Sequence, residues 1–305
     1  MIIILNIQLT ILLIIAVGYG ITKAGIFAQK TRADLTDIVI YVVLPCNIFN
    51  SFQSGVTPDT MRQSVIVLLA AFGLQLLVYL LNKVIYFRIP PERSVVLKYA
   101  TITNNAAFMG LPVIGAVFGP TGVLYGAVFL IPMRIFMWTM GLSLFTNAER
   151  KKRVMTLATH PCMWAVVIGF GCVFAPFEFP PFLLNAIAFI GECTRVLPMF
   201  IIGSILASVK PKDILDKQLY YYSFFRLAAI PAIMFGAMTL LRVDPLVTGV
   251  AVLSSAMPSA VATAMLAEKY GQDAVFGSKV VFVSTMLSIV TLPSIAAALN
   301  WLLPL

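Results

Sequence analysis

Long apolar segments, each about as long as a helix that crosses a bilayer, follow one another along the whole chain. A transmembrane helix needs about 20 apolar residues to span the hydrocarbon core. Of the 305 residues, 60% are hydrophobic and only 11% are charged, whereas about a quarter of the residues in a soluble domain are charged. The sequence therefore predicts an all-α membrane protein whose main solvent is the lipid bilayer.

Ten such segments can be separated, and the connections between them are short and rich in glycine and proline. We expect transmembrane helices at residues 2–21, 35–54, 63–86, 94–118, 121–145, 160–176, 181–208, 219–241, 245–267 and 274–300.

Basic residues are distributed unequally between the two sets of connections. Of the 21 lysines and arginines, 16 lie in the connections after the first, third, fifth, seventh and ninth helices and three lie within helices, whereas the opposite connections hold only Arg62 and Arg242. Connections rich in Lys and Arg stay in the cytoplasm. We therefore expect a multi-pass protein of the cell inner membrane with both termini outside the cytoplasm. This bias accounts for the net charge of +9, so nucleic acid is not an expected partner.

The two halves of the chain repeat short motifs at a nearly constant offset. The Val-Leu-Pro motif that ends at Pro45 recurs at Pro198, and an aromatic-glycine motif at Gly119 recurs at Gly271. Because each half holds five helices, the second must be inverted relative to the first, as in many secondary transporters. The expected units are a first five-helix repeat at 1–145, a cytoplasmic linker at 146–159 and a second, inverted repeat at 160–305.

The fourth and ninth helices have polar centres that proline interrupts, at Pro112 and Pro258. Proline removes a backbone donor, and broken backbone at membrane depth is tolerated only inside protein or along a wet cavity. Interrupted segments at matching places in two repeats are typical of a transport site. Two proline kinks without a ligand are the alternative. We interpret Pro45 and Pro198 as simple kinks.

If these breaks form a transport site, a small carboxylate binds near mid-membrane where they meet. The first N–H groups after a break carry the positive end of a helix dipole and can bind an anion. Neither centre contains a charged residue, so a neutral or zwitterionic solute is also compatible with the sequence. The candidate substrate-binding residues are Asn104, Asn105, Phe108, Gly110, Pro112, Met257, Pro258, Ser259, Thr263 and Asn47.

Charged residues within the helices form a second group of candidates. Glu192 and Arg195 are three residues apart and share a helical face. A charge at bilayer depth costs at least about 2.5–3.5 kcal/mol, so we expect this pair and Arg134 inside the protein. Glu192 is the candidate for coupling to protons, and a pair that locks two helices is the alternative. Arg226 is expected to extend to the nearer membrane surface.

The sequence contains no motif for catalysis or for metal binding. His160 is the single histidine, and no zinc-protease, nucleophile-elbow or phosphate-loop motif is present. The four cysteines lie in apolar runs and form no Cys-x-x-Cys motif. We expect no enzyme, no cofactor and no metal site. Coupling to Na⁺ or H⁺ is left open, and so is assembly as a homodimer.

The broken centres resemble those of a known family. Asn104-x-x-x-Phe108-x-Gly110-x-Pro112 and Met257-Pro258-Ser259-Ala260 resemble the bacterial branch of the auxin efflux carrier family, and the resemblance covers essentially the whole chain. It implies ten helices in two inverted repeats, with broken helices 4 and 9 crossing as in bile-acid sodium symporters. It also implies an organic anion as substrate, such as malate or malonate in some bacteria. The plant exporters carry Asn-Pro at the crossing, whereas Ala106 follows Asn105 here, which argues against auxin.

These observations favour a secondary transporter that moves a small organic anion by alternating access, with its site at the crossing. A sodium/proton antiporter normally has carboxylates at the broken helices, and neither centre contains one. A channel or receptor with the same fold is a further alternative. A membrane enzyme ranks last, because no catalytic motif is present.

Overall fold

The computed structural model describes residues 2–52, 58–145, 159, 161–174, 179–207 and 214–303. Within these ranges every regular element is helical, and the one extended pairing is a bridge between Asn104 and Ser259. The expected all-helical class is confirmed. Apart from Thr159, the predicted linker 146–159 lies outside the described residues, and so does His160.

The first half of the chain forms ten helical elements, several of which continue directly into the next. They are α1 (Ile2–Lys23), α2 (Gln29–Ile38), η1 (Val39–Val43), α3 (Leu44–Phe52), α4 (Pro58–Ile85), α5 (Pro91–Ile102), η2 (Ala106–Gly110), α6 (Leu111–Phe136), η3 (Met137–Gly141) and α7 (Leu142–Phe145).

The second half has the same character. Its elements are α9 (Pro161–Phe174), α10 (Pro181–Glu192), η4 (Cys193–Arg195), α11 (Leu197–Leu206), α12 (Lys217–Phe224), η6 (Phe225–Ala229), α13 (Ile230–Leu240), α14 (Pro245–Ser255), α15 (Ala262–Lys269) and α16 (Ala274–Leu302).

Six helices in the described part of the chain are long and apolar enough to cross a membrane, and two shorter apolar helices fall below that length. A multi-pass membrane protein is therefore the class that the structure supports. The count of ten crossings and the inverted repeat remain predictions. The six helices are Gln29–Asn50, Arg62–Ile85, Thr121–Phe145, Pro181–Leu206, Lys217–Leu240 and Ala274–Leu302.

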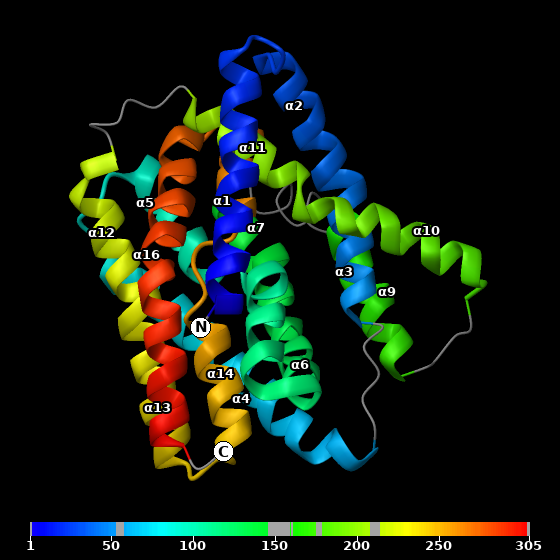
Figure 1. Cartoon of the computed structure of the whole chain (residues 1–305), viewed down its shortest axis with the longest axis vertical. Coiled ribbons are helices and arrows are strands. Elements are labelled where there is room, and N and C mark those ends of the chain that lie inside the picture. Colours follow the sequence, from blue (N-terminus) through cyan, green and yellow to red (C-terminus); the bar gives the residue numbers. More distant parts are fainter. Residues whose placement is uncertain are drawn as a thin grey trace.

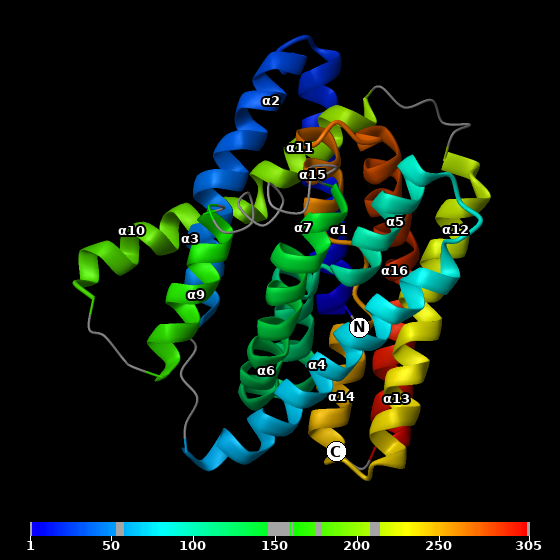
Figure 2. The same ribbon diagram turned by 180° about the vertical axis from the view of Figure 1, so that it is seen from behind.

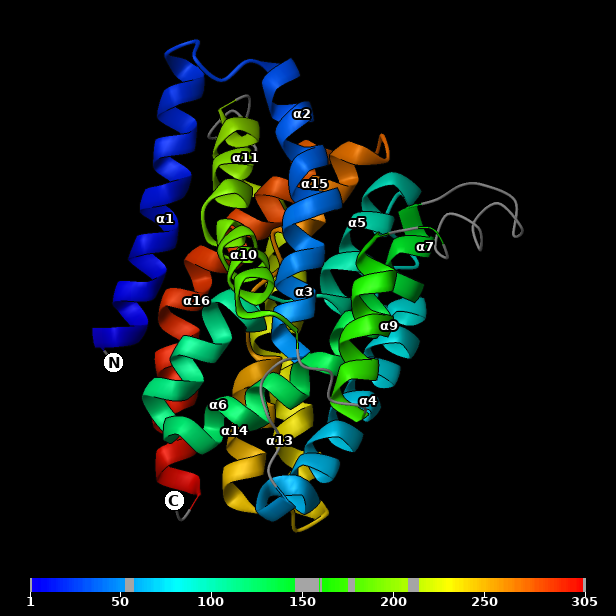
Figure 3. The ribbon, with the colours of Figure 1, turned by 90° about the vertical axis from the view of Figure 1, so that its right-hand side faces the viewer.

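Two groups of helices pack around the centre of the molecule. In the first, α1 lies along α11, and α3 packs against α9 and α10 (Figure 3). In the second, α6 packs against α4 and α14, and α16 packs against α12 and α15. Small residues let α1 and α11 approach closely, since a Cβ on Gly18 would lie 2.6 Å from the carbonyl oxygen of Phe200.

One expected helix, at 181–208, is broken rather than continuous. The α-helical pattern stops at the 3₁₀ turn Cys193–Arg195 and resumes in α11, where Pro198 lies in the first turn. Proline at that position cannot donate to a carbonyl in the preceding turn. As a result α10 extends sideways from the body of the molecule (Figures 1 and 2). The simple kink expected at Pro198 is therefore a full change of direction.

A glycine marks the boundary between the fourth and fifth predicted helices. Gly119 has φ 69° and ψ −164° inside the segment assigned to α6. This backbone conformation is essentially restricted to glycine. The chain therefore bends there, between the runs expected at 94–118 and 121–145.

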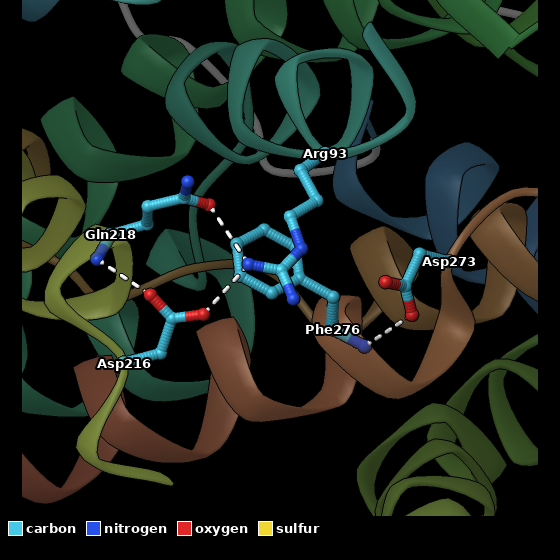
Figure 4. A network of polar contacts seen from close by, with 5 residues as sticks. All are labelled: Arg93, Asp216, Gln218, Asp273 and Phe276. Carbon is cyan, nitrogen blue, oxygen red and sulfur yellow. Dashed lines mark hydrogen bonds and ion pairs between the residues drawn. The ribbon is translucent and has the colours of Figure 1, made fainter. Parts of the chain in front are cut away.

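We call the end that carries the α1–α2, α4–α5 and α15–α16 connections the basic end; it is uppermost in Figure 1. At this end Arg93 of α5 donates from Nη1 to Asp216 Oδ2 (2.8 Å) and to Gln218 Oε1 (3.2 Å). Its guanidinium also lies 4.7 Å from the ring centroid of Phe276 in α16 (Figure 4). These contacts hold the start of three helices together.

Candidate functional site

The breaks in the two interrupted helices touch each other. α5 ends at Ile102 and α14 ends at Ser255, and the chain between each of them and the following helix is extended or turned. The N–H of Asn105 donates to the carbonyl oxygen of Pro258 over 2.9 Å. The expected crossing of the two broken segments is therefore present.

Asn104 holds the crossing together with its side chain. Its Nδ2 donates to the carbonyl of Ser254 over 2.7 Å, and its Oδ1 accepts the N–H of Ala106 over 3.2 Å. The residue is 5% exposed. Each bond involves a backbone group that a helix end leaves without an intrahelical partner. The amide is thus already used by the protein itself.

Arg226 joins the carboxyl ends of both half-helices. It belongs to η6, is 2% exposed, and donates from all three guanidinium nitrogens over 3.0 Å. The expectation that its side chain reaches the membrane surface is wrong, because these carbonyls lie at the crossing and hold it there. The acceptors are the carbonyl oxygens of Thr101, Ser255 and Met257.

A small cavity lies at the amino-terminal side of the crossing, with a volume of about 40 Å³. It is bordered by Ala107 in the first turn of η2 and by Ala262, the first residue of α15. The first N–H groups of a helix have no intrahelical partner. None of its lining residues is acidic. They are Leu44, Asn104, Asn105, Ala107, Met133, Arg134, Met137, Pro198, Ala260, Val261, Ala262 and Met265.

A wider cavity of about 720 Å³ adjoins the small one, and both are lined by Ala107 and Arg134. It contains the candidates Asn47 and Pro112, and its lining residues come mainly from α3, α6 and α10. The remaining lining residues are Asn50, Leu111, Gly115, Val123, Leu130, Ala188, Gly191, Glu192 and Arg195.

Arg134 lies where the two cavities meet. It is 5% exposed, and its Nη2 donates to Asn47 Oδ1 over 3.1 Å. Its Nε is buried and has no hydrogen-bond partner among the described residues. None of the ion pairs formed by the described residues involves Arg134. The expected position inside the protein is confirmed, and a guanidinium without an ion-pair partner among the described residues lines both cavities.

Glu192 and Arg195 form an ion pair of 3.7 Å, as their spacing predicts, but the pair is not inside the protein. The side chain of Glu192 is 60% exposed and that of Arg195 is 69% exposed. The break at η4 explains this, because α10 turns away from the packed body there. Both residues instead border the wide cavity.

The other candidates on the ninth helix belong to the packed crossing and do not line either cavity. The hydroxyls of Ser259 and Thr263 are 3.1 Å apart, and the N–H of Ser259 donates to Ser284 Oγ over 3.2 Å. Met257 packs against Gly110, where a Cβ would lie 3.3 Å from the Met257 Cγ. The side chain of Phe108 lies outside the described part of the structure.

Leu44 and Pro198 are among the small-cavity residues that sequence reasoning missed. Both belong to the Val-Leu-Pro motif that recurs in the two halves, which was interpreted as a kink. The repetition itself was the available signal. The three carbonyl partners of Arg226 lie far from it in the sequence, so no local pattern could have predicted them.

The described residues contain no group of three or more His, Cys, Asp or Glu side chains that could hold a metal ion. The small cavity offers recognition by hydrogen bonds and charge: one guanidinium, the amide of Asn105, for which no hydrogen bond is seen among the described residues, and the first turns of two helices. Such an arrangement can bind an anion.

Comparison with known proteins identifies the family. The family model described as "Membrane transport protein" matches residues 3–156 and again residues 150–296. An uncharacterized transporter of Methanocaldococcus jannaschii is 27% identical over 98% of this chain and 98% of its own length. An uncharacterized transporter of Methanothermobacter thermautotrophicus is 25% identical over 93% of this chain and 95% of its own length. The chain therefore belongs to the membrane transport protein family, the family of the auxin efflux carriers that its sequence resembles.

Proposed function

We propose that this membrane transport protein is a secondary transporter that carries a small organic anion, bound through a carboxylate, by alternating access. The observation that carries the proposal is Arg134, a buried guanidinium between two cavities whose Nε has no partner among the described residues. Arginine stays charged, and a buried charge left unpaired is strongly unfavourable. A carboxylate in the small cavity would supply the partner.

The surroundings of Arg134 support an anion rather than a cation. Asn105 lines the same cavity and can donate from its amide. The first turns of η2 and α15, at Ala107 and Ala262, border it as well, and the start of a helix carries positive partial charge. Because no acidic side chain lines this cavity, these positive contributions are not cancelled.

The sizes of the two cavities support movement between states. A volume of about 40 Å³ is close to that of one water molecule, roughly 30 Å³. An organic acid therefore needs the small cavity to open. The wide cavity of about 720 Å³ lies within the range of ligand pockets, about 300–1,000 Å³. We propose that it is the route by which substrate reaches Arg134.

We propose that the wide cavity opens to the side opposite the basic end. The support is that ion pairs of Arg32 with Glu268 and of Arg93 with Asp216 tie helices together at the basic end. If the basic end is cytoplasmic, this conformation faces outward. Single cysteines at Arg242 and Gln272 should then react with an impermeant reagent from opposite sides of the membrane, and reaction from one side would refute the orientation.

We further propose that residues 1–145 and 160–305 are inverted five-helix repeats. The support is that the family model matches both parts of the chain and that each part contributes one broken helix to the crossing. The Val-Leu-Pro motifs, which place Leu44 and Pro198 at the same cavity, agree with this relationship.

Binding of small carboxylates to purified protein tests the site. Acetate, succinate and malate should be compared by thermal shift and calorimetry with wild type, Arg134→Gln, Arg134→Lys and the surface control Arg242→Gln. We expect Arg134→Gln to abolish binding, and Arg134→Lys to weaken it at least tenfold, because lysine cannot bind a carboxylate in bidentate fashion. Wild-type affinity in Arg134→Gln would show that the site lies elsewhere.

Counterflow in proteoliposomes separates a carrier from a channel with the same fold. A carrier preloaded with unlabelled substrate accumulates labelled substrate transiently, because each binding site returns loaded. A channel shows no such stimulation. Absence of counterflow for an anion that binds to Arg134 would leave the binding site in place and exclude alternating access.

A further inference from the structure

Three main-chain carbonyls from two half-helices converge on one guanidinium at the centre of the protein. Arg226 reaches Thr101 at the end of α5 and Ser255 at the end of α14, as well as Met257 just beyond it. Nε, Nη1 and Nη2 each donate to a different carbonyl oxygen over 3.0 Å. The side chain is 2% exposed, and no described carboxylate forms an ion pair with it.

The chemistry of these oxygens is that of a cation site. The carboxyl end of a helix leaves carbonyls without intrahelical donors and carries negative partial charge. In transporters with discontinuous helices, unwound carbonyls and the carboxyl ends of half-helices coordinate the coupling Na⁺. Here the carbonyls at the carboxyl ends of α5 and α14 are ligands of the same kind. The positive charge next to them is not a bound ion but the guanidinium of Arg226.

We propose that Arg226 is a tethered replacement for a coupling cation, so that anion binding and transport by this protein do not require Na⁺. The inference rests on the proposed function and deepens it by assigning the coupling. Arg226 neutralises the carboxyl ends of the half-helices, while Arg134 and the amino ends of η2 and α15 lie on the cavity side of the same crossing. A guanidinium fixed to η6 cannot be released with the substrate.

The geometry explains why an arginine suits this role. Its guanidinium is planar, always charged and carries five donors, so it can bind several carbonyls at once without a carboxylate. A lysine would offer one compact ammonium at the end of a flexible chain. Arg226 is therefore a positioning residue, which acts on the substrate through the helices that it holds.

The first test is made on the unaltered protein in sodium-free solution. Melting temperature, the melting shift caused by succinate, and uptake into proteoliposomes should be measured in NaCl and in choline chloride at equal ionic strength. We expect equal values in the two salts. A higher melting temperature, tighter succinate binding or faster uptake in NaCl would overturn the proposal.

The second test asks whether the three carbonyl oxygens bind a cation when the side chain of Arg226 is removed. Arg226→Ala should melt several degrees lower than wild type, and millimolar guanidinium should restore part of that loss, whereas choline should not. The exposed control Arg242→Ala should show neither effect. Failure of guanidinium to stabilise Arg226→Ala more than it stabilises Arg242→Ala would overturn the proposal.

If Arg226→Ala does not fold, Arg226→Lys takes its place. Arg226→Lys keeps the positive charge but makes fewer hydrogen bonds, so it should fold and have a lower melting temperature than wild type. Its melting temperature should be the same with and without Na⁺. Dependence of Arg226→Lys on Na⁺ would contradict the inference. These melting experiments need no substrate, so they stand even if no carboxylate binds at Arg134, which would refute only the proposed function.

Discussion

Arg32 Nε lies 2.6 Å from Glu268 Oε1, and this ion pair joins α2 near the start of the chain to the carboxyl end of α15. The side chains are 15% and 18% exposed. A second pair, Lys269 with Asp37, connects the same two helices. Because α15 carries residues that line the small cavity, including Met265, these pairs hold one wall of that cavity against α2.

Reversal of the charge in this ion pair should open the basic end. Arg32→Glu places two carboxylates together, and Glu268→Arg places two guanidinium groups together, so each should repel α15 from α2. In a background without the four native cysteines, Met265→Cys should react faster with a maleimide from the basic end in either single reversal. The charge swap that combines both changes should restore slow labelling. Equal rates in all four proteins would show that the pair does not close this end.

Asn104 and Asn105 should have separable roles although they are neighbours. Asn104→Ala removes two hydrogen bonds and leaves buried backbone groups without partners, at about 1–3 kcal/mol for each unsatisfied group. We therefore expect a clear loss in melting temperature. Asn105→Ala removes an amide for which no hydrogen bond is seen within the described chain, so the melting temperature should change little while succinate binding weakens. A lower melting temperature in Asn105→Ala together with weaker succinate binding in Asn104→Ala would show that Asn105 holds the structure and Asn104 binds the substrate.

Glu192 and Arg195 should influence the rate of substrate entry more than stability. An exposed pair contributes about 0–1 kcal/mol, so Glu192→Gln and Arg195→Gln should each fold almost as well as wild type. Removal of Arg195 should slow anion uptake and removal of Glu192 should speed it, and high salt should suppress both effects. Complete loss of transport in Glu192→Gln at every salt concentration would instead indicate an essential proton carrier.

The close approach of α1 and α11 predicts a sharp difference between two glycines on α1. Gly18→Ala would bring a Cβ to 2.6 Å from the Phe200 carbonyl oxygen, and overpacking of this kind costs about 1–3 kcal/mol. Gly20→Ala meets nothing within 4 Å and should leave the melting temperature unchanged or slightly higher. Equal melting of the two variants would show that α1 moves away from α11 without cost.

The elements that the sequence predicted well are those set by local chemistry. Apolar runs, the glycine bend at Gly119 and the polar breaks around Asn105 and Pro258 depend on a few neighbouring residues, and the structure contains them. The sideways course of α10 depends on how the chain packs before Pro198, which no local pattern specifies. For the same reason Glu192 was expected inside the protein and is exposed.

The candidate site could be located from the sequence but not resolved into roles. Proline and asparagine indicated where the helices break. The position of a break, however, does not show which side chains form hydrogen bonds within the protein and which face a cavity. Asn104 also lines the small cavity, but its side chain and that of Ser259 form hydrogen bonds within the protein. For the amide of Asn105 and for Nε of Arg134, no hydrogen bond is seen among the described residues. The partners of Arg226 come from two other helices, and such long-range choices are made by tertiary packing.

The wide cavity has an electrical consequence. Where an aqueous cavity enters a membrane protein, the potential inside it follows that of the adjoining solution, so the transmembrane voltage falls across the remaining closed stretch. If the wide cavity opens to the solution opposite the basic end, as proposed above, that stretch runs from Arg134 to the basic end. A single charge that crosses it experiences nearly the full potential, about 2.3 kcal/mol per 100 mV, over a few turns of helix. The crossing is therefore the place where the membrane voltage acts on whatever charge this protein moves.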